Sequence, residues 1–129
     1  MQKFSISTRS RNEFIDITQK VTSIVNKSAK ENGVCTVYCP HTTGAITINE
    51  SADPNVASDI NMKLRKLIPK NENYSHAEGN SDAHIKSSLV GNSVQVIIDN
   101  GALQLGTWQG IFFCEFDGPR TRKVWIEIS

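Results

Sequence analysis

Residues 93–128 read SVQVIIDNGALQLGTWQGIFFCEFDGPRTRKVWIEI. This stretch holds four short runs in which Val, Ile, Leu or Phe recur, at residues 93–98, 102–105, 109–116 and 122–128. Asp-Asn-Gly and Asp-Gly-Pro, both typical of turns, separate the first two and the last two runs. Short runs of β-branched and aromatic residues between turns are typical of β-strands, and we expect the last three strands to form a meander.

The same patterns extend toward the N-terminus. Further strands are predicted at residues 2–8, 13–17, 34–39 and 45–49. Three helices are predicted: residues 18–30 with Thr18 as cap and Gly33 as stop, a helix from Asp53-Pro54 to before Pro69, and a short one from Ser81 or Asp82 to near Gly91. The polar segment 70–81 is long for a loop, which favours a binding role or disorder. The sequence therefore predicts one α+β domain over residues 1–129, with mainly antiparallel sheets and about three helices.

Composition supports a sheet-rich fold and excludes several functions. The chain has 32 β-branched residues but only 5 Leu, which disfavours an all-helical protein. Its 14 basic and 13 acidic residues balance, so nothing favours nucleic-acid binding. No apolar run approaches the length of a membrane span, and the N-terminus lacks the pattern of a signal peptide. We therefore expect a cytoplasmic protein with no membrane partner, in which the 3 cysteines stay reduced.

Three histidines, His41, His76 and His84, all occupy polar positions. Three imidazoles can fill three positions of a tetrahedral zinc site and leave the fourth open to water or substrate. Their separations of 35 and 8 residues match no short ligand motif. The alternative is three unrelated surface or capping histidines.

Polar residues near the histidines are candidates for catalysis and anion binding. Glu50 or Asp82 could act as a general base or orient a metal ligand, although a solvated strand end and a helix cap are equally ordinary roles. Around the start of the last predicted helix, hydroxyls, an ammonium and free N–H groups could bind a phosphate. These anion-binding candidates are Lys86, Ser87, Ser88 and, after the Asp-Gly-Pro turn, Arg120. The alternative is a solvated basic turn.

The strand at residues 109–116 and the run before it hold unusual residues. Trp108, flanked by glycines, could stack on a ligand or cap the core. Alternation puts Phe112, Cys114 and Phe116 on one face and Phe113 and Glu115 on the other. A Glu that faces inward there is costly unless it is paired or metal-bound.

Four runs resemble the YjbQ family, also called the secondary thiamine-phosphate synthase family. They are CPHTTGAITINE at 39–50, NYSH at 73–76, GNSDAHIKSS at 79–88 and GTWQG at 106–110. The resemblance implies a compact α+β fold, a cytosolic homotrimer, and a divalent metal, with zinc expected, held by His41, His76 and His84. It groups further motif residues at the same site: Thr42, Thr43, Asn49, Glu50, Asp82, Lys86, Ser87, Ser88, Thr107, Trp108 and Gln109. The segment between the second and third histidines departs from the family pattern.

The activity that the resemblance implies is thiamine-phosphate synthesis, in which a pyrimidine pyrophosphate is joined to a thiazole phosphate and pyrophosphate leaves. A metal, Lys86 and Arg120 could stabilise the leaving charge, and Trp108 could stack on a heterocycle. The expected partners are thus a small phosphorylated molecule and further copies of the chain. Two alternatives remain open: a metal-dependent phosphate or pyrophosphate hydrolase, and a non-catalytic trimeric module that binds a ligand or metal.

Overall fold

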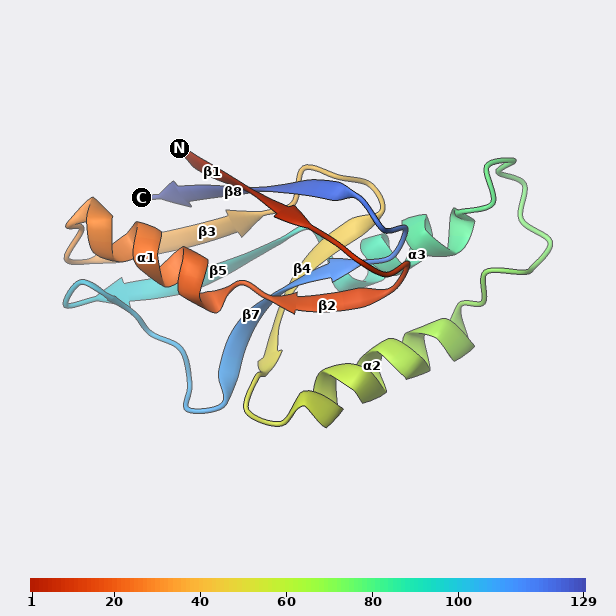
Figure 1. Ribbon diagram of the computed structural model, residues 1–129. Coiled ribbons are helices and arrows are strands. Elements are labelled where there is room, and N and C mark those ends of the chain that lie inside the picture. Colours follow the sequence, from red (N-terminus) through yellow and green to blue (C-terminus); the bar gives the residue numbers. More distant parts are fainter.

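Eight strands form two antiparallel sheets with three helices beside them, in a computed structural model that describes residues 1–129 (Figure 1). The strands are β1 (Gln2–Ser7), β2 (Glu13–Asp16), β3 (Gly33–Tyr38), β4 (Gly44–Glu50), β5 (Ser93–Asp99), β6 (Ala102–Leu103), β7 (Gln109–Glu115) and β8 (Thr121–Ile128). The helices are α1 (Thr18–Ser28), α2 (Pro54–Leu67) and α3 (Ser81–Val90). The predicted α+β class with antiparallel sheets and three helices is confirmed.

The strand order corrects the predicted meander. The five-stranded sheet runs β1-β8-β3-β5-β6, and the three-stranded sheet runs β2-β7-β4. Only β5 and β6 pair as consecutive strands of the C-terminal part, because β7 crosses to the other sheet before β8 returns. Every residue of β7 after Gln109 is buried, so this strand needs cover on both faces and takes the centre of the smaller sheet.

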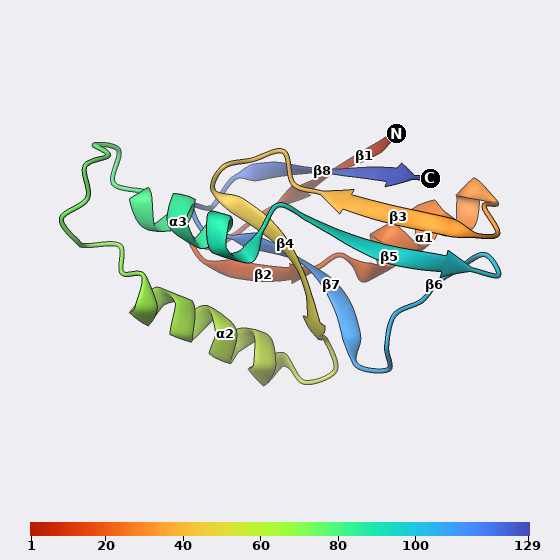
Figure 2. The ribbon, with the colours of Figure 1, turned by 180° about the vertical axis from the view of Figure 1, so that it is seen from behind.

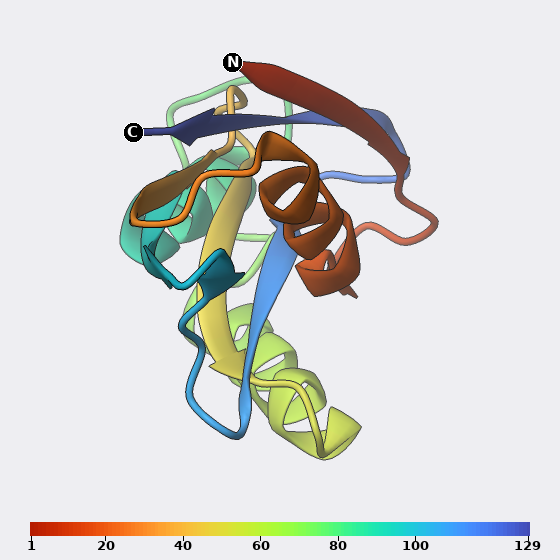
Figure 3. The same cartoon turned by 90° about the vertical axis from the view of Figure 1, so that its left-hand side faces the viewer.

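Two apolar clusters lie on the two faces of that central strand. Phe113 belongs to the main core, which also holds Ile46, Val37 and Val124 from both sheets and Val21 from α1. Phe112, Cys114 and Phe116 form the second cluster, where Ala83 of α3 and Leu64 of α2 pack. The predicted division of this strand into two faces is confirmed. Figure 3 shows α1 beside β7 and beneath the β1–β8 edge.

The helix ends follow the predictions in part. Asp53 caps α2 as predicted, because its carboxylate accepts from the Asn55 N–H. At α1 the cap is different: Thr18 is the first helical residue, and Asp16 accepts from its N–H and hydroxyl. That helix ends at Ala29, whose φ of 56° is left-handed, and Gly33 instead begins β3. α3 begins after Asn80 with no side-chain cap.

Three segments meet at one end of the molecule and position the candidate site. The β3–β4 loop, the β7–β8 turn and α3 lie together there, as Figures 1 and 2 show from opposite sides. Backbone hydrogen bonds join them: the Ile46 N–H donates to Gly91 just after α3, and the Phe116 N–H donates to Thr43. None of the three helices is both long and apolar enough to cross a membrane.

Candidate functional site

The main candidate site is a polar cleft between the β3–β4 loop, α3 and the β7–β8 turn. It has two connected halves that share His41, Thr42 and His84, with volumes of about 520 Å³ and 370 Å³. The first half is lined also by Gly44, Ser87, Ser88, Gly91 and Asn92. The second is lined also by Pro40, Thr43, Glu78, Asn80, Asp117, Arg120 and Arg122. No large apolar side chain lines either half, so the cleft is suited to a hydrophilic ligand.

His41 is held in one orientation by the neighbouring strand. Its Nε2 accepts a hydrogen bond from the Lys123 backbone N–H, with 2.9 Å between the nitrogens. The neutral ring must then carry its proton on Nδ1. Burial, and next the charge of Arg122, lower the pKa of His41 below its ordinary 6.5. The cleft therefore contains a neutral imidazole whose Nδ1–H can donate a hydrogen bond.

A buried ion pair supports the loop that carries His41. Glu115 and Arg122 are 0% and 4% exposed and bond to each other through two pairs of atoms. Arg122 also donates to the hydroxyl of Thr43 at 2.9 Å and to its carbonyl, while Thr8 donates to Glu115 at 2.9 Å. The inward-facing Glu115 is thus paired rather than metal-bound. Its partner Arg122 connects β8 to the loop before β4, and so holds the loop beside His41.

A second buried network lies beneath α3, and it shows that the roles predicted for Asp82 and Lys86 were wrong. Asp82 is fully buried and accepts from Arg11 at 2.9 Å and from Lys86 at 3.1 Å. Burial alone would raise the pKa of Asp82, but the bonds from Arg11 and Lys86 outweigh burial and lower this pKa to about 2. Lys86, 1% exposed, lies over the Phe116 ring. Asp82 and Lys86 therefore hold α3 in place, and neither lines the cleft as a base or a phosphate ligand.

Two polar atoms beside the cleft are buried without a hydrogen-bond partner. They are Oγ of Ser87, in the first half, and Oδ1 of Asn80, in the second. Ser87 is only 8% exposed, so its hydroxyl is largely removed from water. Leaving a buried polar group unpaired costs about 1–3 kcal/mol. A bound molecule that pairs with these atoms would recover that cost.

The three histidines do not form a metal centre within this chain. His76 and His84 lie edge to face, with 5.3 Å between ring centroids, and His76 approaches Glu78 rather than His41. No group of three His, Cys, Asp or Glu side chains is arranged to hold a metal ion. The neutral His41 ring has no free lone pair for a metal, because Nε2 accepts from Lys123 and Nδ1 holds the proton. The residues present thus do not fit the expected zinc site, and the metal stays a prediction.

Several motif residues lie away from the cleft. Glu50 and Asn49 end β4, whose other end, Gly44, is the one beside the histidines, and Glu50 lines a separate groove. Trp108 is 62% exposed in the loop between β6 and β7 and lines neither half of the cleft. The Gly106 N–H donates to the side-chain oxygen of Gln109, the first residue of β7, and Thr107 lies in the loop before that strand. The family resemblance groups these residues with the histidines, but none of them lines the cleft in this chain.

The cleft also contains polar residues that were not predicted from the motifs. Asn80 precedes α3, and Asp117 lies in the Asp-Gly-Pro turn, where it accepts from Asn80 and Arg120. Asn92 follows α3, and its carbonyl accepts from the Cys39 N–H. The available signals were the place of Asn80 in the run GNSDAHIKSS and that of Asp117 in the predicted Asp-Gly-Pro turn.

Comparison with known proteins identifies the family. The family model described as "UPF0047 protein YjbQ-like" matches residues 2–129. The chain belongs to the UPF0047 family of YjbQ-like proteins. It is 56% identical to UPF0047 protein MJ1081 of Methanocaldococcus jannaschii, over 98% of this chain and 91% of that protein. It is 49% identical to UPF0047 protein YugU of Bacillus subtilis, over 99% and 98%.

Solved structures of UPF0047 and YjbQ-like proteins share the fold. An uncharacterized YjbQ/UPF0047 protein from Clostridium acetobutylicum superposes with a TM-score of 0.98 at 54% identity, over 100% of both chains. A YbjQ-like protein from Sulfolobus solfataricus superposes with a TM-score of 0.95 at 34% identity, over 98% and 94% of the two chains, and is described as of unknown function.

These findings overturn the expected thiamine-phosphate synthase function. The matched UPF0047 relatives are named without that activity, and their solved structures are described as uncharacterized or of unknown function. The geometry agrees, because no aromatic platform for a heterocycle lines the cleft and the histidines do not gather as metal ligands.

Proposed function

We propose that the polar cleft binds a small, hydrophilic phosphorylated molecule. The observation that carries this proposal is the pair of buried, unpartnered polar atoms, Ser87 Oγ and Asn80 Oδ1, on either side of the two imidazoles. Such atoms are rare in folded proteins and favour a missing partner at the site. Without apolar lining, the cleft offers hydrogen bonds rather than hydrophobic contact.

Two arginines, Arg120 and Arg122, line the second half of the cleft together with Glu78 and Asp117, and the exposed Arg120 is the cation that an anionic group can reach. Arg120, whose side chain is 52% exposed, lines this half and is held by Asp117 through both its side chain and its carbonyl. Nδ1–H of His41 is a second donor, whereas the charge of Arg122 is paired with Glu115. A guanidinium with a fixed orientation is the side chain best suited to the oxygens of a phosphate.

We propose further that the site is catalytic and that His84 moves a proton to or from the bound molecule. His84 lines both halves of the cleft, from the first turn of α3, and the Asp82–Lys86 network fixes that helix. Imidazole is the common proton-transfer group in enzymes at neutral pH. Replacement of His84 by Gln should abolish turnover of an identified phosphorylated ligand while leaving its binding nearly intact. Unchanged turnover would refute this role.

Thermal unfolding with matched ligands tests the binding proposal. Sugar phosphates, nucleoside monophosphates and phosphorylated carboxylic acids are compared with their dephosphorylated counterparts. A ligand at ten times its Kd stabilises the folded state by about 1.4 kcal/mol, so binding should raise Tm measurably. Arg120→Ala should remove the rise, and Arg9→Ala, a change at an exposed arginine outside the cleft, should keep it. Equal shifts for phosphorylated and dephosphorylated ligands would refute the proposal.

The assembly and location expected from the family resemblance belong with this proposal. A homotrimer is tested by sedimentation velocity of the purified protein, and cytoplasmic location by fractionation of the source cells. A single species with the mass of one 14.3 kDa chain would refute the trimer.

A further inference from the structure

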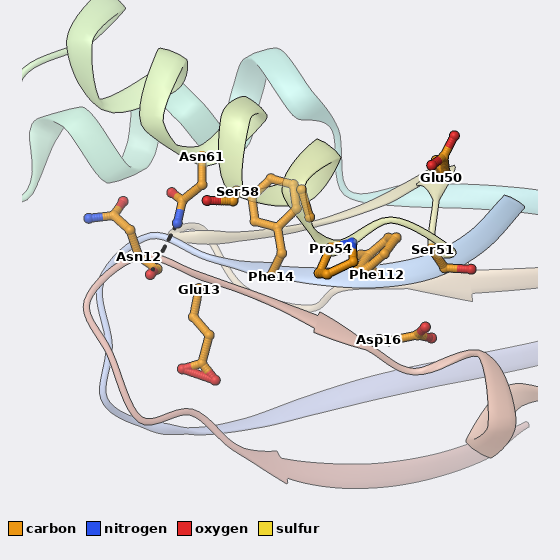
Figure 4. A pocket seen from close by; sticks show the side chains of 11 residues that line it. Asn12, Glu13, Phe14, Asp16, Glu50, Ser51, Pro54, Ser58, Asn61 and Phe112 are labelled. Carbon is orange, nitrogen blue, oxygen red and sulfur yellow. Dashed lines mark hydrogen bonds between the residues drawn. The ribbon is translucent and has the colours of Figure 1, made fainter. Parts of the chain in front are cut away.

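A second groove, separate from the polar cleft, lies between α2 and the three-stranded sheet. Its volume is about 430 Å³, within the range of small-molecule sites. It shares no lining residue with either half of the cleft. Figure 4 shows Phe14 directed toward α2 near Ser58, and Phe112 beside Pro54. No residue of α2 is fully buried, so the helix leaves this space open instead of filling it.

Two aromatic rings form the apolar part of the groove. The Phe14 and Phe112 rings are tilted by 47°, with 6.3 Å between their centroids. Phe14 is half-buried, so part of its surface stays open to a ligand, whereas Phe112 is 6% exposed. An ammonium group over the open part of the Phe14 ring would be attracted by the negative face of that ring.

The charges around the groove have one sign. Glu13, Asp16 and Glu50 line it, and no basic residue does. Glu13 accepts from two backbone N–H groups, and one oxygen of Asp16 caps α1, so these two are partly used by the fold. The Glu50 carboxylate makes no hydrogen bond or ion pair with any residue of the chain. It remains free to pair with a ligand.

The backbone brings the acidic end of the groove together. A Cβ added at Gly110 on β7 would lie 2.5 Å from Cβ of Ser51 and 3.1 Å from Oγ1 of Thr18, so only Gly fits there. Ser51, which follows Glu50, and Thr18, which Asp16 caps, thus approach each other across β7.

Midway along α2, Oδ1 of Asn61 is buried without a partner while its amide nitrogen donates to the Asn12 carbonyl, as the dashed line in Figure 4 shows. This oxygen is an acceptor for an N–H group.

We propose that this groove binds a small organic cation with an apolar body and one ammonium group. The apolar body lies against Phe14 and Phe112, and the ammonium group pairs with Glu50 and with acceptors on the acidic side. This assignment gives Glu50 a binding role away from the histidines. It does not rest on the function proposed for the polar cleft, and either one can fail alone.

Binding of benzylammonium, followed by amide chemical shifts of the full-length protein, tests the proposal. Benzyl alcohol and benzoate are the neutral and anionic controls of similar shape. We expect saturable shifts at residues 12–16 and 50–61 with a Kd of about 1 mM, weakened by added salt. Benzyl alcohol should bind more weakly, and benzoate should not bind at this groove.

Variants separate the charge of Glu50 from general effects on the fold. Glu50→Gln should weaken benzylammonium binding about two- to fivefold, as expected for a partly exposed charge pair. Glu31→Gln removes an exposed acid elsewhere and should leave the Kd unchanged. Phe14→Leu keeps apolar volume but removes the ring, and should weaken the ammonium more than the alcohol. No saturable binding at the groove, equal affinity for benzyl alcohol, or an unchanged Kd in Glu50→Gln would each overturn the proposal.

Discussion

Nε2 of His41 accepts a hydrogen bond from the Lys123 backbone N–H, with 2.9 Å between the two nitrogens. A backbone donor on a central strand cannot rotate away, so this contact fixes the ring of the imidazole nearest the buried Arg122. It also decides which nitrogen faces a ligand and removes His41 from the set of ready metal ligands.

The first prediction concerns the proton of His41. At pH 7.5 the ring should be neutral with the proton on Nδ1, because Nε2 is engaged by Lys123. Long-range ¹H–¹⁵N spectra of histidine-labelled protein distinguish the two tautomers. A His41 spectrum with the proton on Nε2 would show that the hydrogen bond is absent in solution.

The pH dependence of His41 follows from the same contacts. Burial and Arg122 lower its pKa below 6.5, so the folded state disfavours the imidazolium. This neutral form contributes to stability fully above pH 6.5, and the contribution is lost as the pH falls through the lower, folded value. An NMR titration of the His41 ring should therefore have its midpoint below 6.5, and a midpoint at or above it would contradict the account.

Stability should depend strongly on the Glu115–Arg122 pair. Glu115→Gln leaves the Arg122 guanidinium buried without a counter-charge, which should lower the free energy of unfolding by about 3–5 kcal/mol. Glu127→Gln, at a side chain that is 63% exposed, should change it by less than about 0.5 kcal/mol. Urea unfolding measures both. Similar small losses in the two variants would mean that the buried pair does not support the cleft.

Acid sensitivity should be traceable to Asp82. Its ordinary pKa of 3.8 is lowered to about 2 in the folded protein, so its charge stabilises the fold above pH 4. This contribution is lost as the pH falls from about 4 to about 2. Asp82→Asn should be less stable at pH 7 and should show a flatter pH dependence in that window. Asp59→Asn, at an exposed position of α2, should keep the wild-type dependence.

Trp108 should be dispensable for the cleft. Its side chain is 62% exposed and lines neither half. Trp108→Ala should leave the Kd of a phosphorylated ligand within about twofold of wild type, since it removes no contact with the site. Calorimetric titration measures this directly. A large loss of affinity would show that the loop folds over the ligand when it binds.

Local sequence patterns predicted the elements of this fold better than their pairing. Periodicity and turn residues located every helix and strand to within a few residues, because those signals act over neighbouring positions. The crossing of β7 into the other sheet could not be read in this way, since the segments before and after it look equally strand-like. Both faces of β7 are covered, because Phe113 packs in the main core and Phe112 in the second apolar cluster. These contacts are made by segments distant in sequence, so local patterns do not reveal them.

The sequence motifs identified about half of the residues that line the cleft, but they also assigned to it residues that lie elsewhere. His41, His84, Ser87 and Arg120 meet because their segments share one end of the sheets. Glu50 lies six residue steps of strand from Gly44, about 20 Å, so it does not reach the cleft of its own chain. Lys86 and Asp82 occupy the inner face of α3, where helical spacing pairs them four residues apart. Sequence alone could not show that this helix buries its charged face.

The most direct test of the cleft is a titration of uniformly ¹⁵N-labelled protein with inorganic phosphate, compared with chloride at equal ionic strength. The account predicts saturable shifts at the amides of His41–Thr43, His84–Ser88 and Arg120, which Ser87→Ala and Arg120→Ala weaken and Arg9→Ala does not. Shifts that are absent, that match those with chloride, or that map away from these residues would contradict the assignment of the cleft as an anion-binding site.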